Sequence, residues 1–310
     1  MAANNLFIIG SPRSGTTFLA SLLKPTAYGE PFETQFILKY FDKLENYGSL
    51  EQDANVTTLL KDIEKERAIA QWQVPLNGAD AVKFMGQDRS YQKLVDYIGT
   101  ALMASRGKQL WGDKTPHYIL QFEKLVALYP DAKFLYIIRD GRDVALSLLR
   151  KDWGPNNVYA CAQQWVDGNS MEVFRQTEAL KAKGNLHYIN YETLLTNPEQ
   201  ECAKIYQFLD DDIENYRDEV EKLIAKTMSG NFSKWKTKMS ATQIEVYESV
   251  AGDVLNAHGY ELMTKNASIG SVKRKLYHLH DRVLWLKHMF VQNVIDGILI
   301  KFFGKQPFNK

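Results

Sequence analysis

The first 23 residues hold the feature that most constrains this 310-residue chain, a short apolar run followed by a glycine-bounded polar turn. The run from Leu6 to Ile9 predicts a buried strand, and Gly10 to Thr17 form the turn. Apolar residues then recur at helical spacing as far as Leu23, which predicts a helix. A strand, a tight glycine loop and a helix N-terminus together predict a phosphate site. Backbone N–H groups converge there on the anion, and the helix dipole favours its charge.

This loop departs from the loop of nucleoside triphosphatases at one informative position. That loop reads G-x-x-x-x-G-K-[ST], with a lysine that reaches the β- and γ-phosphates. Gly10 and Gly15 have the required separation, but Thr16 stands where the lysine should be, which argues against hydrolysis of ATP or GTP. The cation lies instead within the loop, at Arg13, whose guanidinium can hold a terminal anionic group in a forked geometry.

Apolar runs typical of buried strands alternate with helical patterns along the rest of the chain. We expect strands at 110–113, 132–138 and 185–190, helices at 51–70, 90–105, 117–129, 157–183 and 198–209, and an irregular loop at 71–89. This alternation predicts an α/β fold of three layers, with a central parallel sheet between helices. Ligands bind at the carboxyl ends of such strands, so the Arg13 loop, Lys114 and Arg139, each following a strand, can meet on one edge.

Composition excludes several classes of protein. A hydrophobic content of 45% and a charged content of 24% are ordinary for a globular protein, and a net charge of +1 gives no case for nucleic acid as a partner. Two cysteines, Cys161 and Cys202, exclude a disulfide framework, and the six histidines show no zinc-type spacing, so we expect no metal. Because no basic segment followed by an apolar run opens the sequence, we expect a cytoplasmic protein.

The loop from Ser11 to Thr17 resembles the 5′-phosphosulfate-binding loop of sulfotransferases, in the form found in bacterial and tyrosylprotein enzymes. Members of that family transfer a sulfuryl group from 3′-phosphoadenosine-5′-phosphosulfate (PAPS) and release adenosine 3′,5′-bisphosphate (PAP). The resemblance implies a P-loop-like fold with PAPS bound by Pro12, Arg13, Ser14, Gly15, Thr16 and Thr17.

A second stretch resembles the family's 3′-phosphate motif, R-(N/D)-x-R-D-x-x-x-S. Residues 139–147 read RDGRDVALS, and the match implies that Arg139 and Ser147 hold the 3′-phosphate. We expect Arg142 and Asp143 to form a salt bridge at the start of a helix instead of binding the donor. Two phosphate motifs in the family's order, about 130 residues apart, are more specific than either alone.

Three shorter matches follow the family's order, and the resemblance covers about residues 5–263. The segment DKTP implies that Lys114 lies beside the sulfuryl group, and YETL implies that Tyr191 lies near the adenine. The late segment SKWK resembles the one that closes over the nucleotide, through Lys234, Trp235 and Lys236. Plain surface charge is an equally good interpretation of the two lysines.

Sulfuryl transfer needs a base for the acceptor proton, cations for the charge on the sulfuryl oxygens and the leaving phosphate, and an in-line nucleophile. Fixed Arg and Lys side chains can replace magnesium here. The run FETQF resembles the family's P-E-T-H-F, whose glutamate is the proposed base. We therefore expect Glu33 to be the base, with Glu30 as the alternative, and Arg13 and Lys114 to supply the catalytic cations.

The C-terminal segment lies beyond the resemblance, so we divide the chain into a PAPS-binding domain, 1–263, and a basic helical extension, 264–310. The extension carries nine Lys and Arg against two acidic residues, a net charge of +7, which leaves −6 for residues 1–263. Residues 271–303 predict an amphipathic helix. Three binding partners remain possible for this helix. They are the anionic inner face of a membrane, a second copy of the chain, and the acidic body of the same chain.

These observations favour a PAPS-dependent sulfotransferase over two alternatives. A P-loop small-molecule kinase is disfavoured by Thr16 at the lysine position and by the pair Arg139 and Ser147. A non-catalytic nucleotide-binding protein is disfavoured by the presence of Glu33 and Lys114. The acceptor, whether a small molecule, a carbohydrate or a lipid, is not readable from the sequence.

Overall fold

The computed structural model describes residues 5–225, 231–265 and 267–303, which pack into two compact units. The first unit contains residues 1–139 and 172–230, and the second contains 140–171 and 231–310. The predicted domain boundary between residues 263 and 264 is a different division of the chain and stays a prediction.

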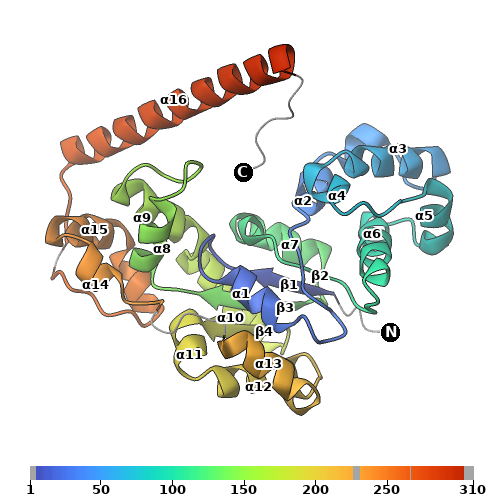
Figure 1. Cartoon of the computed structure of the whole chain (residues 1–310), viewed down its shortest axis with the longest axis horizontal. Helices are drawn as coiled ribbons and strands as arrows, with labels where there is room; N and C mark the ends of the chain where they lie inside the picture. Colours follow the sequence, from blue (N-terminus) through green and yellow to red (C-terminus); the bar gives the residue numbers. More distant parts are fainter. Residues whose placement is uncertain (1–4, 226–230, 266, 304–310) are drawn as a thin grey trace. The chain divides into compact units, whose positions relative to one another are not determined.

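A sheet of four parallel strands forms the centre of the first unit (Figure 1). The strands are β1 (Leu6–Ile9), β2 (Gly112–Asp113), β3 (Lys133–Ile138) and β4 (Leu186–Asn190), in the order β2-β1-β3-β4. β1 pairs with both β2 and β3. The glycine-bounded loop that follows β1 therefore lies between the carboxyl ends of β2 and β3. This arrangement confirms the predicted parallel sheet and brings the ends of β1, β2 and β3 to one edge.

Helices cover both faces of the sheet, as the three-layer prediction requires. Alternate residues of β1 enter different cores. Leu6 and Ile8 pack with the helices that follow β1 and β4, whereas Phe7 and Ile9 pack with helices on the other face. Strands buried on both faces read as continuous apolar runs. The helices on this second face come from the segments between β1 and β3 and from the helix before β4.

The helices and 3₁₀ turns of the first unit have the following bounds: α1 (Thr16–Leu22), α2 (Ile37–Phe41), η1 (Leu44–Tyr47), α3 (Asp53–Glu64), α4 (Arg67–Ala70), α5 (Gly78–Met85), α6 (Tyr91–Ser105), η2 (Pro116–Gln121), α7 (Phe122–Leu128), α11 (Tyr191–Thr196), α12 (Pro198–Phe208), η3 (Ile213–Tyr216) and α13 (Arg217–Ala225). α10 (Met171–Ala182) lies in this unit from its second residue onward.

Several predicted elements differ from the structure. The helix expected at 51–70 is divided into α3 and α4, and the one expected at 117–129 begins as the 3₁₀ turn η2. The segment 71–89 is not wholly irregular, because Asn77 caps α5 by accepting hydrogen bonds from the N–H groups of Ala79 and Asp80. The helix expected at 157–183 is broken between α9 (Val158–Gly168) and α10. At the break, the buried Asn169 side chain donates to the Trp165 carbonyl at 2.6 Å, a local bond that competes with continued helix.

The second unit is helical in its described residues, with α8 (Gly141–Leu148), α9, α14 (Trp235–Lys238), α15 (Ala241–Ala257) and α16 (Ser271–Phe303). α15 packs on α8 and α9, and Ser240 begins α15 with a capping box to Gln243. α16 has the bounds expected for the C-terminal helix. None of the described helices combines the length and the apolar character needed to cross a membrane.

Candidate active site

The glycine-bounded loop between β1 and α1 keeps its shape through two glycines with positive φ. Gly10 (φ 151°) approaches β3 so closely that a Cβ would lie 2.3 Å from the Ile137 carbonyl oxygen. A Cβ on Gly15 (φ 102°) would lie 2.5 Å from the Tyr191 ring. Arg13 also takes the left-handed conformation, at φ 73°, which costs a non-glycine residue on the order of 1 kcal/mol. Such a residue is typical of a functional loop.

Ser14 is a buried polar side chain of this loop. Its residue is 0% exposed, and its Oγ has no hydrogen-bond partner among the described residues. A buried hydroxyl without a partner is costly unless a ligand satisfies it. The exposed Arg13 lies beside it in the chain, so the turn offers a hydroxyl and a cation together.

Arg139 follows β3 directly and packs against the same loop. Its NH1 donates to the Arg13 carbonyl oxygen at 3.3 Å, and its guanidinium carbon lies 4.5 Å from the centroid of the Tyr191 ring. The loop and the aromatic face thus fix a buried cation near the ends of β1 and β3. The predicted meeting of the Arg13 loop and Arg139 is confirmed.

Lys114, Glu33 and Thr17 form a polar cluster at the end of β2. The Lys114 Nζ lies 2.7 Å from Glu33 Oε1 and 3.5 Å from Thr17 Oγ1, so it links the loop after α1 to the first turn of α1. The Lys114 side chain is 10% exposed and that of Glu33 is 39% exposed. Glu33 Oε2 also accepts a hydrogen bond from Gln35 Nε2 at 3.1 Å. A carboxylate and an ammonium therefore lie together where solvent can reach the carboxylate.

Asp113 supports this cluster, a role that sequence reasoning missed. Its carboxylate accepts hydrogen bonds from the N–H groups of Thr34 and Thr115 at 3.0 and 2.8 Å, and from Thr115 Oγ1 at 3.0 Å. Tyr118 OH in turn accepts from the N–H of Ile37. Burial raises the pKa of Asp113 to about 6 because its effect is larger than that of the hydrogen bonds, which lower the pKa. The D-x-T spacing at the end of a strand, typical of an Asx turn, was the available signal.

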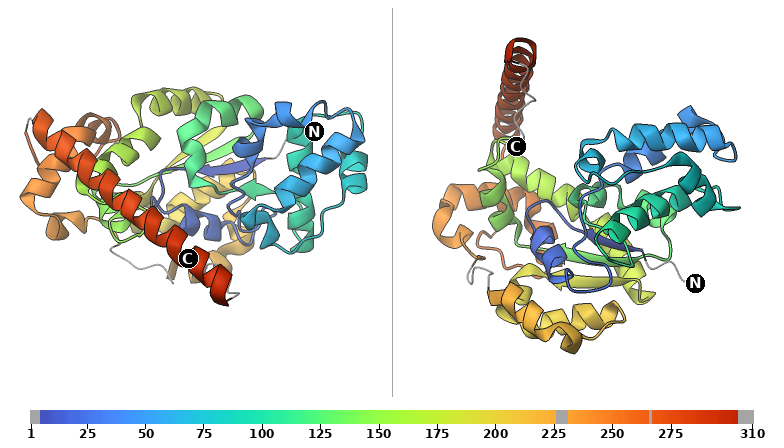
Figure 2. Two further views of the ribbon diagram at one scale, coloured as in Figure 1. Left: turned by 90° about the horizontal axis from the view of Figure 1, so that it is seen from above. Right: turned by 45° about the vertical axis from the view of Figure 1, so that its right-hand side comes forward.

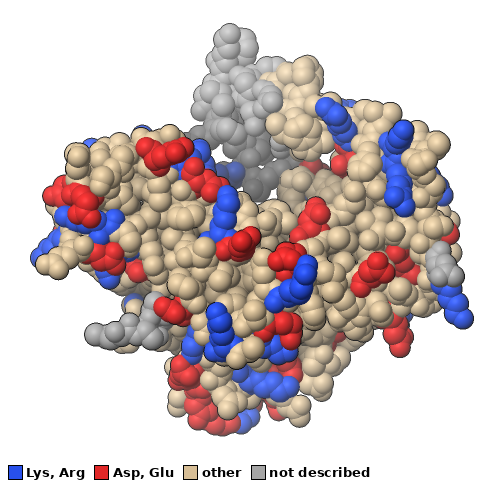
Figure 3. All heavy atoms as spheres, turned by 180° about the vertical axis from the view of Figure 1, so that it is seen from behind, with Lys and Arg blue, Asp and Glu red and all other residues tan. Residues whose placement is uncertain are grey.

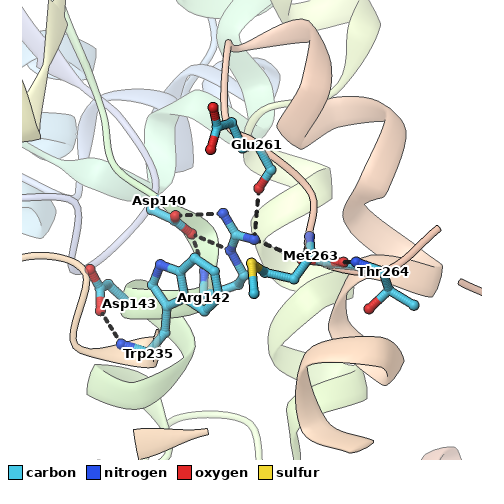
Figure 4. A network of polar contacts seen from close by, with 8 residues as sticks. Asp140, Arg142, Asp143, Trp235, Glu261, Met263 and Thr264 are labelled. Carbon is cyan, nitrogen blue, oxygen red and sulfur yellow. Dashed lines mark hydrogen bonds and ion pairs between the residues drawn. The ribbon is translucent and has the colours of Figure 1, made fainter. Parts of the chain in front are cut away.

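Within the second unit, Arg142 is the centre of a buried polar network (Figure 4). It pairs with Asp140 and Glu248, at 2.8 and 2.7 Å, donates to the Glu261 carbonyl oxygen and packs 3.6 Å from the Trp235 ring centroid. The expected salt bridge between Arg142 and Asp143 is therefore wrong. The distant Glu248 competes for the guanidinium because it is itself fully buried and needs a charge partner.

The remaining predicted donor-binding residues of this unit lie on its own elements. Ser147 is half-buried on α8, and Asp143 Oδ1 accepts from the Trp235 N–H at 3.0 Å. Lys234 Nζ donates to Asn231 Oδ1 at 2.7 Å, and Lys236 is exposed beside the Trp235 ring. Their roles toward a nucleotide stay predictions.

The rest of the predicted set lies in the first unit. Pro12 and Thr16 are buried in the loop and at the start of α1, and Glu30 is exposed just ahead of the loop that carries Glu33. Within the described parts of the chain, no group of three or more His, Cys, Asp or Glu has the arrangement of a metal site.

Comparison with known proteins identifies a family. The profile described as "Sulfotransferase family" matches residues 5–215, more than half of the chain. A nodulation protein, NoeE of Sinorhizobium fredii, is 24% identical over 306 residues, which cover 84% of this chain and 67% of that protein. A protein-tyrosine sulfotransferase of Drosophila melanogaster is 25% identical over 222 residues, 66% of this chain but 38% of that protein.

Among solved structures, the sulfotransferase domain from the curacin biosynthetic pathway is similar in fold. It superposes with a TM-score of 0.52 at 19% identity and covers 84% of this chain and 98% of that domain. At this identity the likeness concerns the fold, and it agrees with the parallel sheet and flanking helices described above.

Proposed function

Because the chain belongs to the sulfotransferase family, we propose that it transfers a sulfuryl group from PAPS to a hydroxyl or amine of an acceptor, with Glu33 as general base. The pairing of the Glu33 carboxylate with the Lys114 ammonium, beside Thr17 of the phosphosulfate loop, is the observation that carries this proposal. The Drosophila relative is named for transfer to protein tyrosine, which supports a hydroxyl acceptor.

The residues of the loop fit an anionic donor. The buried Ser14 hydroxyl, with no partner among the described residues, is available to a phosphosulfate oxygen. Arg13 lies in the same turn. The Arg139 guanidinium, held against the Tyr191 ring, supplies a second cation, which supports a phosphate as its ligand. The side chains present thus match the charges of PAPS.

The chain's own groups perform three tasks in the proposed reaction. The bound donor supplies the sulfuryl group, and its phosphate leaves with the electrons of the broken S–O bond. Glu33 accepts the proton of the acceptor hydroxyl as its oxygen attacks sulfur, a contribution of about 10²–10⁴ in rate. Lys114 and Arg13 donate to the oxygens on which negative charge develops. Glu30, exposed ahead of the same loop, is the alternative base.

Ligand binding and sulfuryl transfer test this function separately. In calorimetric titrations, PAP should bind more tightly than ATP, whereas a small-molecule kinase would prefer ATP. With ³⁵S-labelled PAPS and pooled phenols, sugars and lipids, label should pass to at least one acceptor pool. Tight PAP binding without transfer to any acceptor, and without consumption of PAPS, would instead favour a non-catalytic nucleotide-binding protein.

A further inference from the structure

The helix α16 carries an exposed apolar stripe. Its members are spaced by four and three residues, so they share one face of a helix with 3.6 residues per turn. The exposed fractions lie between 51% and 71% for Val272, Leu276, Leu279, Val283, Leu286 and Phe290. An apolar surface of this kind, continuous along five turns, marks an interaction site.

The opposite side of α16 is the one that packs on its own unit. Asp281 Oδ1 accepts a hydrogen bond from the Asn156 N–H at 2.7 Å, and the Tyr277 ring stacks on Tyr159 with centroids 5.7 Å apart. Both Tyr277 and Asp281 are half-buried, and at about 100° per residue they lie roughly opposite the apolar stripe. Figure 2 shows α16 continuing well beyond these contacts with α9. The stripe is therefore not the face that attaches α16 to the second unit.

Exposed cations border the apolar stripe on both sides. By helical position, Lys275 and Arg282 lie along one border, and Lys273 and Lys287 along the other. Asp281 is the one acidic residue between positions 271 and 293, and it is bound to Asn156. On the face of the molecule shown in Figure 3, by contrast, acidic and basic side chains are interspersed among the described residues. The borders of the stripe thus have one sign of charge.

This charge pattern distinguishes two occupants of the stripe. If two copies paired along it, the cations of one helix would face those of the other with no acidic residue between them, and like charges at such flanking positions are unfavourable. An anionic lipid surface instead accepts an apolar face and pairs with flanking cations, whose long side chains reach the headgroups. Each cation strengthens binding to such a surface about fivefold.

We propose that α16 lies along an anionic lipid bilayer, with its apolar stripe at the level of the headgroups and acyl chains and its bordering cations against acidic headgroups. Asp281 and Tyr277 hold the helix to the enzyme on the opposite side. The helix binds at the surface, in keeping with the absence of a spanning helix from the described residues. This proposal is independent of the proposed donor and acceptor.

Vesicle flotation of the full chain tests the proposal. The protein should float with vesicles of equal phosphatidylglycerol and phosphatidylcholine, and remain below those of phosphatidylcholine alone. The double substitution Lys275→Gln/Lys287→Gln should weaken binding to the anionic vesicles about 30-fold. Leu279→Ser/Leu286→Ser should abolish it at the same protein concentration, because it removes apolar area from the middle of the stripe.

A matched control uses the same chemical changes elsewhere on the surface. Leu120, which is 50% exposed, and Lys61 lie outside α16, and Leu120→Ser/Lys61→Gln should bind anionic vesicles as the wild type does. Circular dichroism and a cooperative thermal unfolding transition establish that each variant is folded. Equal binding to neutral vesicles, no binding to either kind, or an equal loss in the control would overturn the proposal. So would a dimer in sedimentation velocity that the serine variant alone dissociates, because it would assign the stripe to a second copy.

Discussion

Replacing Asp113 with asparagine should make the protein more stable at alkaline pH and less active. Burial raises the pKa of this carboxyl from 3.8 to about 6, so above about pH 7 the folded chain holds a carboxylate whose ionisation costs about 3 kcal/mol more than in the unfolded chain. Asparagine removes that charge. It keeps one acceptor oxygen, however, and turns an NH₂ group toward the N–H of either Thr34 or Thr115, which costs about 1–3 kcal/mol.

The two effects have different pH dependences, which makes the prediction testable. A raised pKa in the folded state gives stability that is present below about pH 4 and is lost as pH rises through about 6. The free energy of unfolding of Asp113→Asn should therefore lie about 1–3 kcal/mol below that of the wild type at low pH. Relative to the wild type it should rise by about 3 kcal/mol across the titration, so that beyond pH 7 it lies up to about 2 kcal/mol above it. Urea unfolding across this range measures the difference, in which the other titrating groups cancel.

Asp88→Asn is the matched control. Its carboxylate is exposed and accepts from the Ser90 N–H, and a hydrogen bond from Ser90 lowers its pKa. The free energy of unfolding of the wild type should exceed that of this variant by an amount that grows with pH. This is opposite to the pH dependence expected for Asp113→Asn. A pH-independent difference for Asp113→Asn would refute the raised pKa. Turnover should fall about 10–10²-fold because the loop that carries Glu33 loses its anchor, and unchanged turnover would refute the positioning role.

Four further results are expected. Glu33→Gln should lower single-turnover transfer about 10²–10⁴-fold with little change in PAP affinity, and a near-normal rate would place the base elsewhere. Arg139→Ala should weaken PAP far more than adenosine 5′-phosphate in titrations, since a charge-assisted bond is worth about 1.5–3 kcal/mol, and equal losses would contradict the 3′-phosphate assignment. Gly15→Ala should lose PAP binding through the clash with the neighbouring tyrosine ring, whereas Gly107→Ala, with positive φ and open space, should keep it. Deletion of 271–310 should leave PAP binding intact while abolishing vesicle flotation, and joint loss of binding and folding would make the segment part of the core.

The position of the site could be predicted because it depends on topology. Arg13, Lys114 and Arg139 each follow a strand, and the carboxyl ends of adjacent parallel strands share one edge. The structure brings Lys114 to Thr17 and Arg139 to the Arg13 carbonyl. Element boundaries that depend on one local hydrogen bond could not be predicted in this way. The break at Asn169 needs a side-chain bond to Trp165 that helical periodicity does not record.

The groups that hold the loop carrying Glu33 were also hidden from sequence reasoning. Thr34 and Tyr118 lie 84 residues apart, and their hydroxyls are 3.0 Å apart because η2, which follows β2, lies against the loop between α1 and α2. Thr34 stands in the run FETQF, but that resemblance assigns a role to Glu33 alone, and Tyr118 stands in none of the named motifs. Composition and spacing identify the residues that can react. The groups that hold those residues in place depend on contacts between segments distant in the chain.

The arginines of the second motif show how residues three positions apart acquire different tasks. Arg139 ends a strand, where it donates to the Arg13 carbonyl oxygen and lies against the face of the Tyr191 ring. Arg142 stands in the first turn of α8, is 2% exposed, and has Asp140 and Glu248 as charge partners. A phosphate at Arg142 would have to displace two carboxylates from a buried site, at a cost of several kcal/mol. Loss of Arg142 should therefore lower the stability of the second unit, whereas loss of Arg139 should lower ligand affinity.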